Sequence, residues 1–288
     1  MNEALWRWLD RLYLGLSRPL GRAARTQALL REPFVQNPPL VAPPTQGRIV
    51  VLAPHPDDEA IGCGGTLRLA ALGGAEVHCL LMTGGELGDA AGAPGETARV
   101  RRAEMQACAG LLGLTAVHEL SGRDQRLAGR PELVDEMRNY LLELQPVALF
   151  LPFYMDAHID HRLSVELLLA AAQATLPPEL PLWGYEVWSP CPANVCVDIS
   201  AVAEIKGRAI GLHASQDSLM HYAEAILGLN RYRAMQVNGR ADPALTHAEA
   251  FVREPLGQYA ERARRWLELN KDASGSISLD CSGLPPLQ

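Results

Sequence analysis

Short apolar runs alternate with longer segments of helical periodicity along most of the chain. The apolar runs predict strands at 49–52, 75–82, 117–120, 147–151, 182–188 and 195–199. The intervening and following segments predict helices at 58–72, 97–112, 131–144, 162–175, 201–213 and 221–235. Such alternation is typical of a doubly wound, mostly parallel, Rossmann-like α/β sheet. In that architecture ligands bind beyond the carboxyl ends of the strands.

Two predicted loops are rich in histidine and carboxylate. His55-Pro56-Asp57-Asp58-Glu59 follows the first strand, and His158-Ile159-Asp160-His161 follows the fourth. Because both loops leave carboxyl ends of strands, we expect them to share one face of the sheet. Imidazole and carboxylate are ligands of hydrolytic Zn²⁺, which needs three protein ligands and an open position. His55 and Asp58 can supply two, and spacing does not decide between His161 and His158 as the third. An acidic helix start would explain the three acids, but not His55.

The first loop resembles the His-Pro-Asp-Asp-Glu signature of the LmbE-like, or PIG-L, family of metal-dependent N-deacetylases. The second resembles that family's His-x-Asp-His, with Ile159 where the family often has Pro. The resemblance implies His55, Asp58 and His161 as metal ligands and Asp57 as the general base. It leaves His158 as a general acid or an oxyanion donor, with Asp160 orienting a histidine. Zn²⁺ is the implied metal, and iron(II) also suits two His and a carboxylate.

Weaker matches extend the resemblance to about residues 48–252. Arg101, in Arg101-Arg102-Ala103-Glu104, is expected to face substrate, and Asp124 to hold sugar hydroxyls. The alternatives are an ion pair of Arg101 with Glu104 or its neighbour, and a turn aspartate at 124. Arg233-Ala234 departs from a frequent Arg-Gly. The family implies a small-molecule or glycolipid substrate that carries an N-acetylglucosamine-type sugar.

Composition narrows the class of protein. The chain has 288 residues, 48% hydrophobic and 20% charged, with a formal net charge of -7. A balance this acidic lacks the broad basic field of a nucleic-acid binder, so no nucleic-acid partner is expected. Six scattered cysteines without a C-x-x-C pair favour a reducing compartment, and we therefore expect a cytoplasmic location.

The ends of the chain differ from its middle. We expect an amphipathic helix and a Pro-rich linker over 1–46, a catalytic domain over 47–270 and a disordered tail over 271–288. Residues 1–31 combine Trp and Leu at helical spacing with several Arg. Such a helix either lies in a membrane interface, as a peripheral contact, or docks on the surface of the domain.

Three other interpretations compete with this one. Gly62-Cys63-Gly64-Gly65 follows a strand, as in nucleotide-binding proteins, but Leu67 stands where the G-x-G-x-x-G motif requires Gly. The glycines are better explained by close approach of the helix to the sheet. A homologue that keeps the metal and binds glycans without catalysis is the second alternative. An amidase acting on sugar-linked thiol conjugates is the third.

Overall fold

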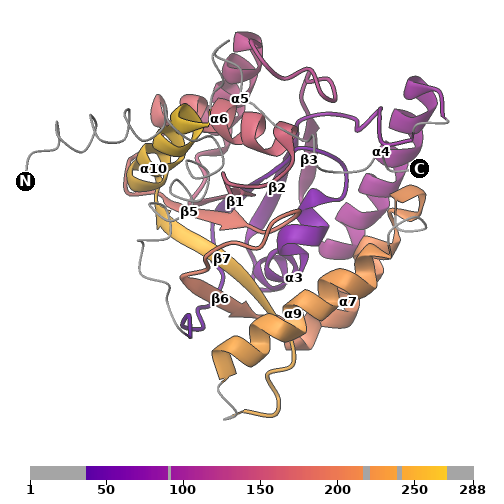
Figure 1. Ribbon diagram of the computed structural model, residues 1–288, viewed down its shortest axis with the longest axis vertical. Helices are drawn as coiled ribbons and strands as arrows, with labels where there is room; N and C mark the ends of the chain where they lie inside the picture. Colours follow the sequence, from indigo (N-terminus) through magenta and orange to yellow (C-terminus); the bar gives the residue numbers. More distant parts are fainter. Residues whose placement is uncertain (1–36, 90–91, 217–220, 239–241, 271–288) are drawn as a thin grey trace, which may run out of the picture. The chain divides into compact units, whose positions relative to one another are not determined.

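A seven-stranded sheet with helices on both faces forms the part of the chain that the computed structural model describes, residues 37–89, 92–216, 221–238 and 242–270 (Figure 1). The predicted N-terminal helix and the tail 271–288 lie outside these ranges. The strands are β1 (Arg48–Ala53), β2 (Glu76–Leu81), β3 (Ala116–Glu119), β4 (Ala148–Pro152), β5 (Pro181–Tyr185), β6 (Val195–Asp198) and β7 (Ala248–Pro255). The helices are α3 (Asp58–Leu72), α4 (Pro94–Leu112), α5 (Pro131–Leu144), α6 (Ile159–Gln173), the 3₁₀ turn η1 (Ser200–Val202), α7 (Ala203–Gly211), α9 (Tyr222–Asn238) and α10 (Leu256–Leu269).

The strand order is β3-β2-β1-β4-β5-β7-β6. The first five strands in that order run parallel, whereas β7 is antiparallel to both neighbours. The sheet is therefore mostly parallel and mixed, and the Rossmann-like prediction is confirmed. The chain winds outward from β1 in one direction and from β4 in the other. The crevice beyond the carboxyl ends of β1 and β4 is thus the switch point where such sheets bind ligands.

Alternating residues of each central strand pack into separate cores on the two faces. Val50 and Leu52 of β1 join one core with side chains of α5, α6 and α10. Ile49 and Val51 join the other core with side chains of α3 and α4. Burial on both faces explains why these strands are continuous apolar runs rather than alternating ones. In Figure 1, α5, α6 and α10 lie at the upper left of the sheet, and α3, α4, α7 and α9 lie at its right and lower right.

The glycines after the first loop bring α3 against the sheet. A Cβ on Gly62 would lie 2.1 Å from Cδ2 of Tyr185 in β5. The helix is kinked at Cys63, which has non-helical angles. Glu249 of β7 accepts the backbone N–H groups of Gly65 (2.8 Å) and Thr66 (2.7 Å) just beyond the kink. These contacts fix the helix whose first turn carries the acidic signature.

Several boundaries differ from the predictions. β7 and α10 were not expected, since charged residues interrupt the apolar pattern of 248–255. α6 begins three residues earlier than expected, because His158 accepts the N–H of Asp160 with its ring and caps the helix. β5 ends at Tyr185, so Val187 and Trp188 lie in a loop rather than a strand. In the described ranges, no helix has the length and apolar character needed to cross a membrane.

Candidate metal centre and active site

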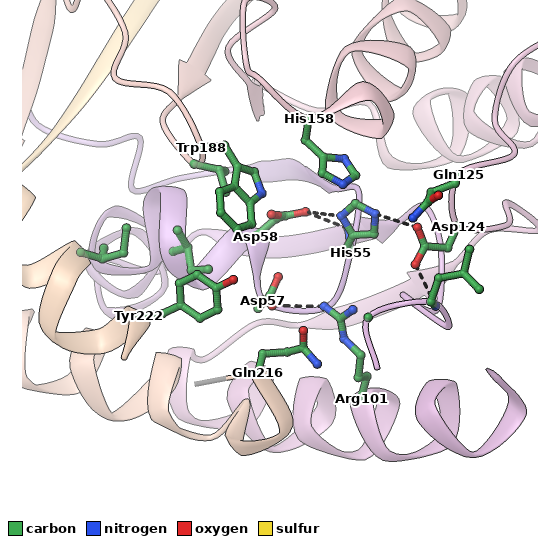
Figure 2. Close-up of a pocket in the computed structure, with 15 residues that line it drawn as sticks. His55, Asp57, Asp58, Arg101, Asp124, Gln125, His158, Trp188, Gln216 and Tyr222 are labelled. Carbon is green, nitrogen blue, oxygen red and sulfur yellow. Dashed lines mark hydrogen bonds and ion pairs between the residues drawn. The ribbon is translucent and has the colours of Figure 1, made fainter. Parts of the chain in front are cut away.

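A cavity of about 230 Å³ opens at the carboxyl ends of β1 and β4 (Figure 2). The residues that line it come from both predicted loops, from the first turn of α3 and from six further segments. They are His55, Asp57, Asp58, Ile61, Leu87, Gly88, Arg101, Asp124, Gln125, His158, Val187, Trp188, Gln216, Tyr222 and Ile226. His161 and Asp160 are fully buried beside it. The structure therefore brings all eight predicted site residues to one place.

The first loop turns sharply so that Asp57 and Asp58 point into the cavity. Asp57 has φ of 124°, in a region that residues with a side chain rarely adopt. Its carbonyl accepts the N–H groups of Ala60 (3.0 Å) and Ile61 (2.9 Å), which starts α3. Strain of this kind persists only where surrounding contacts hold it, and it clusters at functional sites.

Asp58 joins the two loops. Its Oδ2 accepts the backbone N–H of His55 at 2.8 Å and lies 3.3 Å from Nδ1 of the same residue. The same oxygen lies 3.2 Å from Nε2 of His161 in the first turn of α6. A carboxylate and two imidazoles from distant segments thus converge on one point.

Asp156 fixes the second loop. Its Oδ1 accepts the N–H of His158 at 2.9 Å and lies 3.1 Å from Nδ1 of His161. Its Oδ2 accepts the N–H of Trp188 at 2.9 Å. The sequence predicted that Asp160 orients a histidine of this loop, whereas Asp156 is the carboxylate beside His161.

Asp160 and Asp124 both face His55 instead. Nε2 of His55 lies 3.4 Å from Oδ2 of Asp160 and 3.4 Å from Oδ1 of Asp124. Oδ2 of Asp160 also accepts the N–H of Gln125 at 2.6 Å, which anchors the loop after β3. Asp124 accepts the N–H of Leu87 at 3.0 Å. Both acids therefore set the orientation of His55, and Asp124 also reaches the cavity.

Arg101 holds Asp57. Its guanidinium donates to Oδ2 of Asp57 at 3.1 Å and to the carbonyls of Pro56 (2.9 Å) and Gly85 (3.0 Å). The alternative ion pair with Glu104 is not formed, because Glu104 accepts from the backbone and hydroxyl of Ser215. Arg101 lines the cavity, but its first contacts are with the first loop.

Burial and neighbouring charges shift the pKa values of these groups. Burial raises the pKa of Asp57 to about 7, although Arg101 opposes the shift. Burial, together with the charges of His55 and His161, lowers the pKa of His158 to about 4. Burial alone would lower the pKa of His161, but the carboxylates of Asp58 and Asp156 outweigh burial and raise this pKa to about 9. A proton acceptor with a pKa near neutrality and a neutral imidazole thus line the same cavity.

The sequence did not predict the positions of Asp156, Gln125 and Glu59. Asp156 and Gln125 carry no motif of their own, and only the fold shows what they contact. Glu59 points away from the cavity into a buried polar group, where Sγ of Cys108 lies 3.5 Å and Nε2 of His213 lies 4.0 Å from its Oε1. Burial raises the pKa of Glu59 to about 8, so this last acid of the signature is not arranged as a ligand of the cavity.

Known proteins share both the sequence pattern and the fold. The family model "PIG-L: GlcNAc-PI de-N-acetylase" matches residues 50–172. A diacetylchitobiose deacetylase of Thermococcus kodakarensis is 31% identical over 189 residues, covering 59% of this chain and 70% of the relative. The chain belongs to the PIG-L family of deacetylases.

Solved structures agree with membership of the PIG-L family. An N,N'-diacetylchitobiose deacetylase of Pyrococcus horikoshii, complexed with an inhibitor, has a TM-score of 0.65 at 25% identity, covering 74% of this chain and 85% of that one. A conserved protein of Thermus thermophilus has a TM-score of 0.61 at 31% identity, covering 71% and 93%. One less similar structure is a zinc-inhibited form of a teicoplanin deacetylase, 18% identical, which shows the shared fold alone.

The residues that line the cavity, together with His161 beside it, are suited to hold a divalent metal ion. Both ring nitrogens of His161 are buried, and the carboxylate oxygens of Asp58 and Asp156 that lie 3.2 Å and 3.1 Å from them do not meet them with hydrogen-bond geometry. Nitrogens of His55, His158 and His161 lie within 4.8 Å of one another, so the three rings also form a possible ligand group. His158 has one nitrogen committed to Asp160, however, and Asp58 touches both other histidines. His55, Asp58 and His161 therefore remain the ligand set that we expect.

Proposed function

We propose that the chain is a zinc-dependent hydrolase that removes the N-acetyl group from an N-acetylglucosamine-type sugar of a glycoconjugate or sugar-linked metabolite. The observation that carries the proposal is the convergence of His55 and His161 on Asp58, with Asp57 and His158 beside them. Membership of a deacetylase family supports the reaction class. Relatives named for diacetylchitobiose support the sugar.

Each cavity residue has a distinct task in amide hydrolysis. Zn²⁺, when bound, polarises the amide carbonyl and lowers the pKa of a bound water. Asp57 takes the proton of the attacking water as the bond to the carbonyl carbon forms, a role that a pKa near 7 suits. Breakage of the carbon–nitrogen bond then releases acetate and an amine, and the proton held by Asp57 is available to that amine.

His158 presents a defined tautomer to the cavity. Its Nδ1 accepts the N–H of Asp160 at 3.2 Å, so the proton of the neutral ring is on Nε2. A lowered pKa keeps this ring neutral at neutral pH in the metal-free protein. The Nε2–H group is therefore suited to donate a hydrogen bond to the oxyanion of the tetrahedral intermediate. Of the two tasks predicted for His158, this one fits the geometry better than general-acid catalysis.

Arg101 and Asp124 complete the site. Arg101 keeps the carboxylate of Asp57 in place, and its position at the cavity wall suits contact with substrate as well. Asp124 has an oxygen on the N–H of Leu87 and another near His55. We assign it to binding of sugar hydroxyls together with orientation of His55.

Mass spectrometry of a panel of N-acetylated sugars tests this function. Zinc-loaded protein is expected to convert at least one substrate to the free amine, with loss of one acetyl group. His161→Ala is expected to lose both the metal and this product, and zinc content is measured in parallel by elemental analysis. Cleavage of a thiol conjugate without loss of acetyl would favour the amidase, and bound zinc without any product would favour the inactive glycan-binding protein.

A further inference from the structure

The cavity has two unlike ends. Asp124 and Gln125 lie on one side of His55 in Figure 2, and Trp188 and Tyr222 lie on the other. The end with Trp188 is completed by aliphatic side chains. These five residues, which we call the apolar wall, are Ile61, Val187, Trp188, Tyr222 and Ile226.

The apolar wall is built from three separate segments. Ile61 lies one turn after Asp57 in α3, Val187 and Trp188 follow β5, and Tyr222 and Ile226 share one face of α9 at a spacing of four residues. The rings of Trp188 and Tyr222 meet edge to face with centroids 6.0 Å apart. Trp188 is 48% exposed although it is a large apolar residue. Ligand pockets are lined mostly by hydrophobic and aromatic side chains, and the composition of this wall agrees with that pattern.

The carboxylate of Asp156 contacts both the apolar wall and the proposed metal centre. Asp156 accepts the backbone N–H of Trp188 with Oδ2, and its Oδ1 lies 3.1 Å from Nδ1 of His161. Because this contact uses the backbone of Trp188, the indole remains free to face a ligand. The fold therefore sets the distance from the proposed metal centre to the wall.

We propose that the apolar wall binds the aglycone of the substrate, and that this aglycone is an alkyl or aryl group. The inference rests on the deacetylase function proposed above. Three of the five side chains offer no hydrogen-bonding atom, and Trp188 and Tyr222 offer one polar group each. A second sugar ring would place several hydroxyls against this surface, at a cost in desolvation. Gln216 also lines the cavity, but its amide donates to Oγ of Ser215.

The dependence of turnover on aglycone length tests the proposal. The substrates are methyl, butyl and hexyl N-acetylglucosaminides below their micelle concentrations, with diacetylchitobiose as the two-sugar comparison. Each methylene that the wall removes from water raises kcat/KM about three- to fourfold. We therefore expect hexyl to exceed methyl by about tenfold or more. Trp188→Ala and Tyr222→Ala are expected to bring the ratio of kcat/KM for hexyl to kcat/KM for methyl down to within about threefold of one.

Tyr232→Ala is the matched control. Tyr232 lies on α9, is 51% exposed and is absent from the cavity lining, so its loss is expected to keep the full length dependence. Equal kcat/KM for methyl and hexyl substrates in wild type would overturn the proposal. So would a preference for diacetylchitobiose that disappears in Trp188→Ala, because the wall would then stack on a second sugar.

Binding of alkyl glucosides, which lack the acetamido group, separates this inference from the deacetylase function. Calorimetry is expected to show tighter binding of hexyl than of methyl glucoside to wild type, and no such difference in Trp188→Ala. That result without hydrolysis of any N-acetylated sugar would refute the deacetylase function and keep the apolar subsite. Hydrolysis without any length dependence, in turnover or in binding, would refute the apolar subsite alone.

Discussion

Replacing Asp57 by Asn removes an ionisable carboxyl group from the cavity and preserves the shape of the side chain. The amide oxygen can still accept from Nη2 of Arg101, which donates to Asp57 at 3.1 Å. Asn is also among the residues that best tolerate positive φ, so the turn at 124° is retained. Arg101 keeps two carbonyl acceptors. We expect the free energy of unfolding to fall by no more than about 2 kcal/mol.

The effect on turnover is expected to be much larger. An amide cannot take the proton of the attacking water, and loss of a general base costs about 10²–10⁴ in rate. This corresponds to about 3–5 kcal/mol in the activation barrier. The loss should appear in kcat rather than in KM, because the groups that contact the sugar are unchanged. Zinc content should equal that of wild type, since Asp57 is not in the expected ligand set.

Acetate release and zinc content are measured together for three variants. Asp58→Asn is expected to lose zinc and to recover partly when zinc is added, whereas Asp57→Asn recovers nothing. Asp135→Asn is the control, because this residue of α5 is exposed and pairs with Arg138, and it should behave as wild type. The reasoning is refuted if Asp57→Asn retains activity within a few-fold of wild type with its zinc in place.

Further predictions concern the metal, the fold and the N-terminus. Zinc binds neutral imidazole, and the pKa of His161 is raised to about 9. Zinc binding below that pH therefore displaces a proton, and zinc affinity measured by competition should rise about tenfold per pH unit for each proton displaced, until pH passes 9. In the metal-free protein the His161 contribution to stability, followed by urea denaturation, is fully present below about pH 6.5 and disappears as pH rises through about 9; an increase over that range would contradict the ion pairing. Gly62→Ala should lower the free energy of unfolding by about 1–3 kcal/mol, because its Cβ would lie 2.1 Å from the Tyr185 ring; Gly110→Ala, whose Cβ would meet no described atom within 4 Å, should not. If residues 1–31 form an interfacial helix, deleting them should abolish sedimentation with anionic vesicles and spare turnover of a soluble sugar. Equal sedimentation of both forms would favour docking on the domain.

Local patterns were enough to predict six of the seven strands and the two loops. The strands β1, β2 and β4 are apolar runs buried on both faces, so periodicity and length identified them. The acids after β1 and the histidines after β4 lie at carboxyl ends of neighbouring strands, and parallel pairing necessarily brings them together. The sequence alone therefore predicted that imidazole and carboxylate groups meet at the candidate metal site.

The features that the sequence did not predict, β7, the contacts of Asp156 and the early start of α6, depend on contacts made by individual side chains. Glu249 makes β7 look like a polar segment, yet it is fully buried because Lys206 donates to it at 2.6 Å. That pairing spans 43 positions, and no local pattern indicates it. The same holds for Asp156, whose task depends on Trp188 and His161 lying on either side of it. The early start of α6 depends on a histidine side chain serving as a cap, which residue preferences do not suggest.

Metal-dependent removal of an acetyl group is the central claim, and acetate release by stripped and reloaded protein tests it most directly. The protein is treated with a chelator, dialysed and assayed on the best N-acetylated sugar of the panel, before and after addition of one equivalent of zinc. The account predicts that stripping abolishes acetate release and that one equivalent restores it in wild type, but not in Asp57→Asn. Full activity after verified removal of the metal, or no acetate from any sugar after reloading, would contradict it.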